Sequence, residues 1–170
     1  MVYCRKAEKK DITRLVSFTD KLVKNEDLSL GFIQSGFTPN DIESTYVVCI
    51  DDIPVGMVVV ERMDESDYEF YKDKSILVNN TTSVYLSIMA VDIEHMGRGY
   101  GSILMEHVIK ETKGSVLFCD IEISPNINKA SLSFFKKLGF NNDSEYSYIH
   151  MNSVEKRYAF HSYNNISIHI

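Results

Sequence analysis

Three glycines within five residues, Gly97-Arg98-Gly99-Tyr100-Gly101, stand between two segments of regular hydrophobic pattern. Residues 82–91 carry apolar side chains on both alternating faces, which predicts a central strand covered on both sides. Residues 102–113 have helical spacing. Glycines let the backbone turn tightly, so that successive N–H groups point to one place beside the helix N-terminus. The segment therefore predicts a strand, an anion-binding turn and a helix.

A plain glycine turn with a good helix start explains the same pattern. Two other phosphate-binding folds are disfavoured. A nucleotide-hydrolase loop has Lys and then Ser or Thr after its last glycine, whereas Ser102-Ile103 stand there. A dinucleotide-binding fold normally places its glycine loop after the first strand.

The rest of the pattern predicts alternating strands and helices. Strands are expected over 2–4, 45–50, 55–60, 116–123 and 146–151, and helices over 12–23 and 128–138. Residues 25–40 are expected to be a loop with short helical pieces, and residues 61–80 a long hairpin extension or a substrate-side loop. This order implies a mixed sheet with helices packed on it.

Composition limits the class of protein. The chain has 170 residues with 44% hydrophobic content, enough for one domain with a core of its own. Its 18 Lys and Arg against 24 Asp and Glu give a net charge of −6. This charge argues against a nucleic acid or an anionic membrane as the main partner and suits a cationic substrate. No apolar run approaches the ~20 residues of a membrane span, and the start does not resemble a signal peptide.

The cysteines and histidines show no metal-ligand spacing. Cys4, Cys49 and Cys119 are odd in number and lie in apolar or strand-like stretches. They are typical of buried free thiols in a reducing compartment, so we expect a cytoplasmic protein without a metal.

Residues 91–101, Val-Asp-Ile-Glu-His-Met-Gly-Arg-Gly-Tyr-Gly, resemble the acyl-CoA-binding motif of the GNAT acyltransferases, Arg/Gln-x-x-Gly-x-Gly/Ala after a central strand. The resemblance implies that backbone N–H groups of this loop cradle the CoA pyrophosphate. The implied cofactor-binding residues here are Met96, Gly97, Arg98, Gly99, Tyr100, Gly101 and Ser102. Met96 replaces the usual Arg or Gln, which weakens a side-chain contribution and leaves the backbone contacts in place.

Residues 128–140 have the pattern of a core-packing helix, with Asn128 as N-cap and Gly139 at the left-handed position after the last turn. They also resemble the second GNAT motif, Asn-x-x-Ala-x-x-Phe-Tyr-x-x-x-Gly-Phe. The resemblance implies that Asn128 bonds to the pantetheine arm or lies near it. It also implies that the arm's amides pair with the backbone of the central strand. The further cofactor-binding positions implied are Met89, Ala90, Val91, Ser131 and Phe135.

The likeness covers roughly residues 2–151 and implies a GNAT domain over residues 1–153. The implied fold is α/β of the mixed α+β kind, with a central mixed, mostly antiparallel sheet of about six or seven strands flanked by about four helices. Residues 154–170 run past the usual family end. Ile166, Ile168 and Ile170 alternate like a strand, which predicts an extension strand added to the same domain or to a homodimer partner.

Direct acyl transfer needs a neutral amine, so a carboxylate near the thioester is expected to take its proton. The family often places a Glu on the central strand, where this chain has Ser87 and Ile88. On the next strand Asp120 and Glu122 alternate with apolar residues, which puts both carboxylates on one face. Glu122 is the better candidate base. A solvent-facing pair, or a pair that holds a cationic substrate, explains the same pattern.

Phe135 stands where many family members carry a tyrosine proposed to protonate the leaving thiolate. Phenylalanine cannot donate a proton. Three explanations are open: another group protonates the thiolate, solvent does so, or the domain is not a catalyst. Tyr146 and Tyr148 are candidates for the missing donor, with Tyr148 taken as the catalytic candidate, although aromatic residues on a late strand also form core.

The expected function is transfer of an acetyl group from the co-substrate acetyl-CoA to a primary amine, carried by a small molecule or a peptide. No positioned Cys-His pair suggests a covalent acyl-enzyme, so direct attack in a ternary complex is expected. The alternative is a non-catalytic acyl-CoA-binding or interaction module with a GNAT fold. Phe135, Met96 and the carboxylate-free central strand suggest that alternative.

Overall fold

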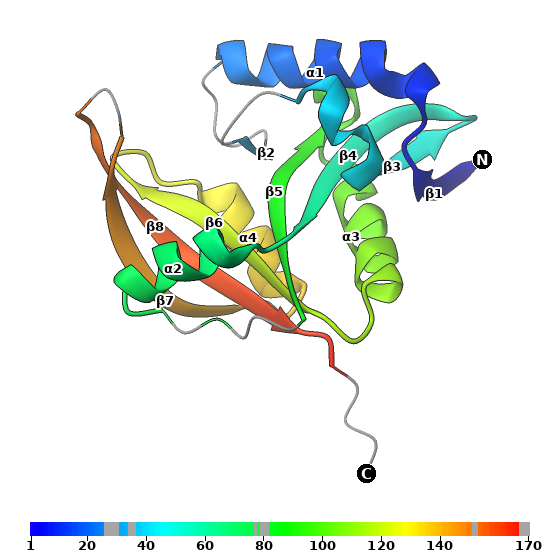
Figure 1. Cartoon of the computed structure of the whole chain (residues 1–170). Helices are drawn as coiled ribbons and strands as arrows, with labels where there is room; N and C mark the ends of the chain where they lie inside the picture. The colour runs from blue at the N-terminus through cyan, green and yellow to red at the C-terminus, as the bar shows by residue number, and fades with distance from the viewer. Residues whose placement is uncertain (26–30, 34–36, 77, 79–81, 151–152, 167–170) are drawn as a thin grey trace. The chain divides into compact units, whose positions relative to one another are not determined.

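The computed structural model describes every residue except 26–30, 34–36, 77, 79–81, 151–152 and 167–170. Its strands are β1 (Val2–Lys6), β2 (Gly31–Ile33), β3 (Thr45–Ile50), β4 (Ile53–Arg62), β5 (Ser83–Val91), β6 (Val116–Ser124), β7 (Asn141–Ile149) and β8 (Glu155–Asn164). They are hydrogen-bonded in the order β1-β3-β4-β5-β6-β8-β7, with β2 paired to β5 (Figure 1).

The sheet is mixed, as the order of elements predicted, and mostly antiparallel, as the family resemblance implied. β5 and β6 pair in parallel, whereas β1–β3, β3–β4, β2–β5, β6–β8 and β7–β8 are antiparallel pairs. The α-helices among the described residues are α1 (Ile12–Asn25), α2 (Glu65–Asp73), α3 (Tyr100–Glu111) and α4 (Lys129–Lys137). Short 3-10 helices cover Lys9–Asp11, Pro39–Ser44 and Ile93–His95.

The chain divides into two compact units, which are described separately. The first unit holds residues 1–60 and 86–112, and the second holds residues 61–85 and 113–170.

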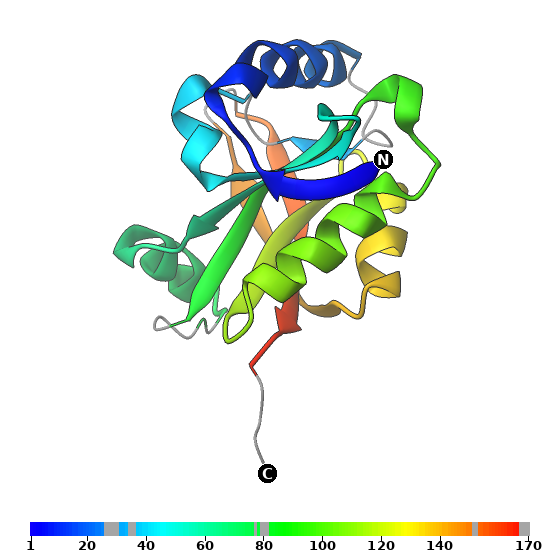
Figure 2. The same ribbon diagram turned by 90° about the vertical axis from the view of Figure 1, so that its right-hand side faces the viewer.

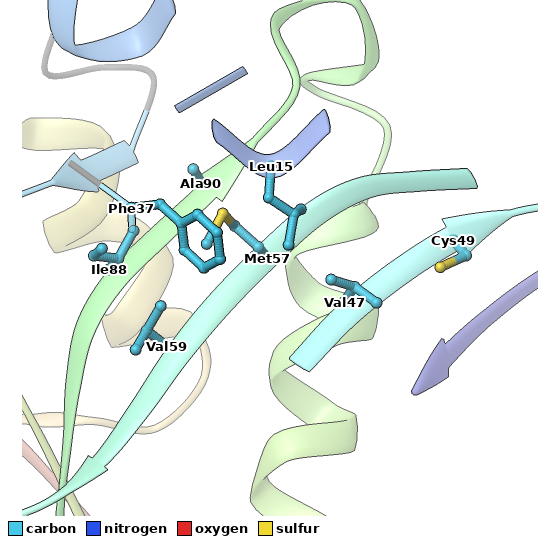
Figure 3. Close-up of a cluster of buried hydrophobic side chains, with 8 residues drawn as sticks. All are labelled: Leu15, Phe37, Val47, Cys49, Met57, Val59, Ile88 and Ala90. Carbon is cyan, nitrogen blue, oxygen red and sulfur yellow. The ribbon is translucent and has the colours of Figure 1, made fainter. Parts of the chain in front are cut away.

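In the first unit, α1 and α3 lie on opposite faces of the strands β1, β3 and β4 (Figures 1 and 2). Leu15 of α1 is fully buried in a cluster to which alternate residues of three strands contribute (Figure 3). Burial of such a leucine contributes roughly 1.5–3 kcal/mol. Tyr46, next to a cluster residue of β3, faces the other way and packs its ring against His107 of α3 at a centroid distance of 5.7 Å. The strands are thus covered on both faces.

The second unit contains a helix that the sequence analysis missed. We expected residues 61–80 to be a hairpin extension or a loop, and this is wrong for α2. Asp64 Oδ1 accepts the N–H of Asp67 at 3.0 Å, and Asp67 Oδ2 accepts the N–H of Asp64 at 2.8 Å. This reciprocal cap starts the helix. Tyr71 is its buried residue, so the apolar stripe is too narrow to stand out in the sequence.

Two aromatic clusters pack on the strands of the second unit. Tyr71 of α2 contacts Phe160 of β8, with ring centroids 4.8 Å apart, in a buried cluster with residues of β6 and β7. Phe135 of α4 packs on Phe140, which in turn packs on Tyr163 of β8. Because Phe160 and Tyr163 are an odd number of residues apart on one strand, the clusters lie on opposite faces of it.

The last strands differ from the expectation. The strand expected over 146–151 is β7, which begins at Asn141 and ends at Ile149. Within residues 154–170 the strand is β8, Glu155–Asn164, whereas Ile166 follows it outside any strand. Ile168 and Ile170, which were expected to belong to the same strand, lie outside the described part of the chain. β8 pairs with β6 on one edge and with β7 on the other, so it is an interior strand and offers no free edge to a partner.

Candidate functional site

The glycine loop of the first unit connects β5 to α3. Gly97 and Gly99 have φ angles of +73° and +84°, and Gly99 is the N-cap residue of α3. A Cβ at either glycine would meet nothing within 4 Å. The positive φ angles, and not a lack of space for a side chain, therefore explain why glycine occupies these two positions. The first N–H groups of α3 have no partners within the helix, so the loop presents donors beside open space.

Asp92 holds the start of this loop in place. Its N–H donates to the carbonyl of Val55 at 2.8 Å, and its carboxylate accepts a bond from Arg14 Nη2 at 3.1 Å. The N–H of His95 donates to the Asp92 carbonyl at 2.8 Å. Asp92 is buried whereas Arg14 is partly exposed, so these contacts connect the loop to α1 and β4 through a partly buried ion pair.

The predicted contact strand for the pantetheine arm is already paired over part of its length. β2 pairs with β5 so that Gly31 opposes Ala90 and Phe32 opposes Met89. Val91 lies beyond this pairing. Backbone pairing of a ligand with Met89 or Ala90 on that edge would therefore require β2 to leave it.

The second motif lies in the second unit and has clear structural roles there. Asn128 caps α4, with its Oδ1 accepting the N–H of Ser131 at 3.1 Å. Asn128, Ser131 and Phe135 are all buried. Their predicted cofactor contacts stay a prediction, because in this arrangement the three side chains serve the helix cap and the core.

The structure brings Asp120 and Glu122 to one face of β6, as the alternation predicted. Asp120 is buried, and its Oδ2 accepts hydrogen bonds from the hydroxyls of Tyr71 and Tyr85, the latter at 2.9 Å. Burial raises the pKa of Asp120 to about 6, although hydrogen bonds from Tyr71, Tyr85 and Tyr146 oppose this. Tyrosines thus enclose the carboxyl group of Asp120. This environment is typical of a structural carboxyl group and not of a base that a substrate can reach.

Glu122 has different neighbours. Its side chain is 10% exposed, and its Oε1 lies 3.0 Å from Nζ of Lys156 on β8. Tyr158, also on β8, lies directly opposite Glu122 in the β6–β8 pair. Tyr158 Oη lies 2.7 Å from Nε2 of His150. The pKa of Tyr158 is raised to about 12 by burial first and by the nearby carboxylates second. Glu122 therefore lies beside an amine and a protonated phenol, and that phenol in turn contacts an imidazole.

Lys156 and Tyr158 were not predicted from the sequence as neighbours of Glu122. Residues 155–164 carry no clear alternation that could have placed these neighbours, because polar and aromatic side chains occupy both faces of β8. Tyr148 on β7 is 40% exposed and packs its ring against Phe70 and His150. It lies in the same unit as Glu122, whereas Met96–Ser102 lie in the first unit.

A family model described as the Acetyltransferase (GNAT) family matches residues 11–140, which is most of the chain. This chain is a GNAT-family acetyltransferase.

Several solved structures share this fold at low sequence identity. The ribosomal-protein-S18-alanine N-acetyltransferase of Escherichia coli is 14% identical, with a TM-score of 0.66 and coverage of 99% of this chain and 97% of that one. An N-acetyltransferase from Staphylococcus aureus Mu50 is 17% identical, with a TM-score of 0.67 and coverage of 96% and 98%. NAA60 of Arabidopsis thaliana, solved with acetyl-CoA, is 13% identical, with a TM-score of 0.67 and coverage of 96% and 99%. A search of curated proteins finds no match.

The GNAT family uses acetyl-CoA, and the glycine loop of this member fits the anionic part of that molecule. Gly97 and Gly99 are exposed, and the space that a Cβ would occupy is open. The free N–H groups at the start of α3 favour a phosphate there. Arg98 is the exposed cation of the loop, and Met96 adds no charge.

Among the residues that the structure describes, no group of three or more His, Cys, Asp or Glu side chains could hold a metal ion. No helix within these described ranges has the length and hydropathy needed to cross a membrane. The three cysteines are free thiols, of which Cys49 and Cys119 are buried.

Proposed function

We propose that this GNAT acetyltransferase moves the acetyl group of acetyl-CoA directly to a primary amine, with Glu122 as general base. The observation that carries the proposal is the 3.0 Å contact between Glu122 Oε1 and a primary amine of the chain itself, Lys156 Nζ. A carboxylate that attracts the ammonium group of Lys156 can also attract the ammonium group of an acceptor amine.

Each residue has a defined task in this proposal. When bound, acetyl-CoA supplies the acyl group and a thiolate leaving group. The backbone N–H groups from Gly97 to Ser102 hold its pyrophosphate. Glu122 accepts the proton of the acceptor ammonium so that the neutral nitrogen can attack. Asp120 is enclosed by tyrosines and positions the strand beside Glu122.

The departing thiolate needs a proton that Phe135 cannot supply. Phe135 is buried and packs against Phe134 and Phe140. Tyr146 bonds to Asp120, and Tyr158 bonds to His150, so both hydroxyls are engaged. We assign the proton transfer to Tyr148, whose side chain is accessible to solvent.

The test of this proposal is the Glu122→Gln variant with a panel of primary amines. Loss of a general base lowers kcat by about 10²–10⁴-fold, and the Kd for CoA should stay the same. Glu145→Gln is the matched control, because Glu145 is also on the second unit and pairs with a cation, Arg157, at 2.8 Å. It should keep full activity.

Initial-rate kinetics decide the order of events. A ternary complex gives intersecting double-reciprocal lines, whereas parallel lines and an isolable acyl-enzyme would contradict direct attack. If the protein binds CoA but acetylates no amine in the panel, a catalytic role is contradicted. The alternative function, a non-catalytic acyl-CoA-binding module, would then be favoured.

A further inference from the structure

Lys156 and Glu122 meet because of the strand register in the second unit. Glu122 opposes Tyr158 across the antiparallel β6–β8 pair. Lys156 lies two residues before Tyr158 and therefore on the same face of β8. A long side chain at this diagonal position reaches the carboxylate on the neighbouring strand. The β6–β8 register shifts between Glu122 and Ser124, a bulge of the kind that re-aims side chains at sheet edges and active sites.

This contact differs from an ordinary surface ion pair. The Glu122 and Lys156 side chains are 10% and 34% exposed, against 45% and 53% for Glu145 and Arg157. Although Lys156 Nζ lies 3.0 Å away, Glu122 Oε1 receives no well-aligned hydrogen bond from the described residues. The oxygen is thus close to an amine and still able to accept a proton.

We propose that Lys156 is a self-acetylation site, to which the chain transfers the acetyl group of acetyl-CoA. This inference rests on the proposed function, in which Glu122 is the base for a primary amine. Lys156 is a primary amine held against that base, and it needs no separate binding step. The local concentration of such a tethered amine favours its reaction over that of a free amine.

Lys156 gives one ammonium proton to Glu122, which passes it to water. The neutral Nζ attacks the thioester carbonyl carbon, so that a C–N bond forms and the C–S bond breaks. The second proton leaves nitrogen and ends on the departing sulfur. The products are acetyl-lysine, the free thiol of CoA and one released proton.

Acetylation also changes the environment of Glu122. It removes the positive charge beside Oε1, because an amide nitrogen is neutral. The carboxylate is then free to receive an external ammonium group. Self-acetylation thus converts a base that is paired within the chain into one available to the acceptor.

To test this inference, the purified full chain is incubated with acetyl-CoA, and the acetylation of each lysine is followed over time by peptide mass spectrometry. Lys156 should gain one acetyl group at least about tenfold faster than the exposed lysines Lys72 and Lys137, which report the chemical background. Glu122→Gln should slow acetylation of Lys156 at least about tenfold and leave that of Lys72 unchanged. Glu145→Gln, the matched control, should change neither rate. A Lys156 rate equal to the background would overturn the inference.

Two further readouts separate the possible failures. In the absence of acetyl-CoA, Glu122→Gln should shift the NMR signal of Lys156 Nζ. An unchanged signal would show that the two side chains are not in contact, and the inference would then be overturned. The acetylation rate per molecule should not depend on enzyme concentration, since a rate that rises with concentration would overturn transfer within one chain. Turnover of external amines without acetylation of Lys156 would overturn this inference alone. Absence of both reactions would overturn the proposed function as well.

Discussion

Tyr85 donates a hydrogen bond of 2.9 Å to Asp120, at the same Oδ2 atom that accepts the hydroxyl of Tyr71. The three residues come from β5, β6 and α2 of the second unit. Both tyrosines remain protonated because burial and the adjacent carboxylate raise the pKa of each hydroxyl. Hydrogen bonds from tyrosines do not fully replace water around a buried carboxylate, so the pKa of Asp120 is higher in the folded protein than in the unfolded chain.

This arrangement predicts a stability that falls as pH rises. The pKa of Asp120 is about 6 in the folded state against an ordinary value of 3.8. The folded state therefore binds the proton more tightly, and the stabilisation is complete below pH 3.8 and lost as pH passes 6. Between about pH 4.5 and pH 7.5 the loss amounts to about 2 kcal/mol.

Asp120→Asn should remove this contribution, since an amide does not titrate. Urea denaturation at the two pH values should show the variant gaining about 2 kcal/mol relative to wild type on going from the lower to the higher pH. Asp73→Asn, at an exposed carboxylate of the same unit, serves as the control and should follow wild type. Parallel pH curves for wild type and Asp120→Asn would contradict the assignment.

Gly56 and Val48 should show coupled effects on stability. A Cβ added at Gly56 would lie 2.9 Å from Val48 Cγ1 and 3.5 Å from the carbonyl oxygen of Ala90. Val48 is fully buried and β-branched, so it cannot turn aside. Gly56→Ala should therefore cost about 1–3 kcal/mol of unfolding free energy.

The double variant Gly56→Ala/Val48→Ala should lose less than the sum of the single variants, by about 1 kcal/mol. The new methyl group would occupy part of the space that Val48 leaves. Gly56→Ala combined with Val59→Ala is the matched control, because Val59 is equally buried and does not meet that Cβ. Chemical denaturation of all variants measures the coupling, and additive losses in both pairs would exclude the steric explanation.

The conformation of Gly99 should matter more for CoA binding than the charge of Arg98. Gly99→Val forces a β-branched residue to a φ of +84° and fills open space where the phosphate is proposed to lie. We expect the Kd for CoA to rise at least about tenfold, or ~1.4 kcal/mol, and Arg98→Ala to cost less because its exposed charge is screened.

Calorimetric titration of the folded variants with CoA measures both effects. Gly139→Ala provides the control for backbone strain, because Gly139 has a φ of +94° after α4, outside the loop. It should lose stability and keep its affinity for CoA. Wild-type affinity in Gly99→Val would mean that the loop is only a structural turn.

Local patterns were sufficient for much of the fold. The β-branched run at residues 45–50 is β3 with the same bounds, and the helix predicted over 128–138 is α4 with Asn128 as its cap. Asp120 and Glu122 share a face because strand periodicity of two residues is a local property. The glycine loop was also recognisable, since positive φ and a helix start leave their mark within a few residues.

Other features depended on pairing between distant segments. α2 was missed because it buries little. The strand expected within residues 154–170 was placed too late in the chain, because polar and aromatic residues occupy both faces of β8. Burial of Asp120 against Tyr71 and Tyr85 requires three elements to pack together.

The sequence by itself determined the family resemblance, most strands and helices, and the two candidate carboxylates, because these follow from the spacing of neighbouring residues. Only the tertiary structure decided which carboxylate is enclosed and which faces an amine. The register of β6 against β8 brings Lys156 within 3.0 Å of Glu122, across more than thirty residues of chain. Strand register is set by burial over the whole sheet, so no local pattern could predict this contact.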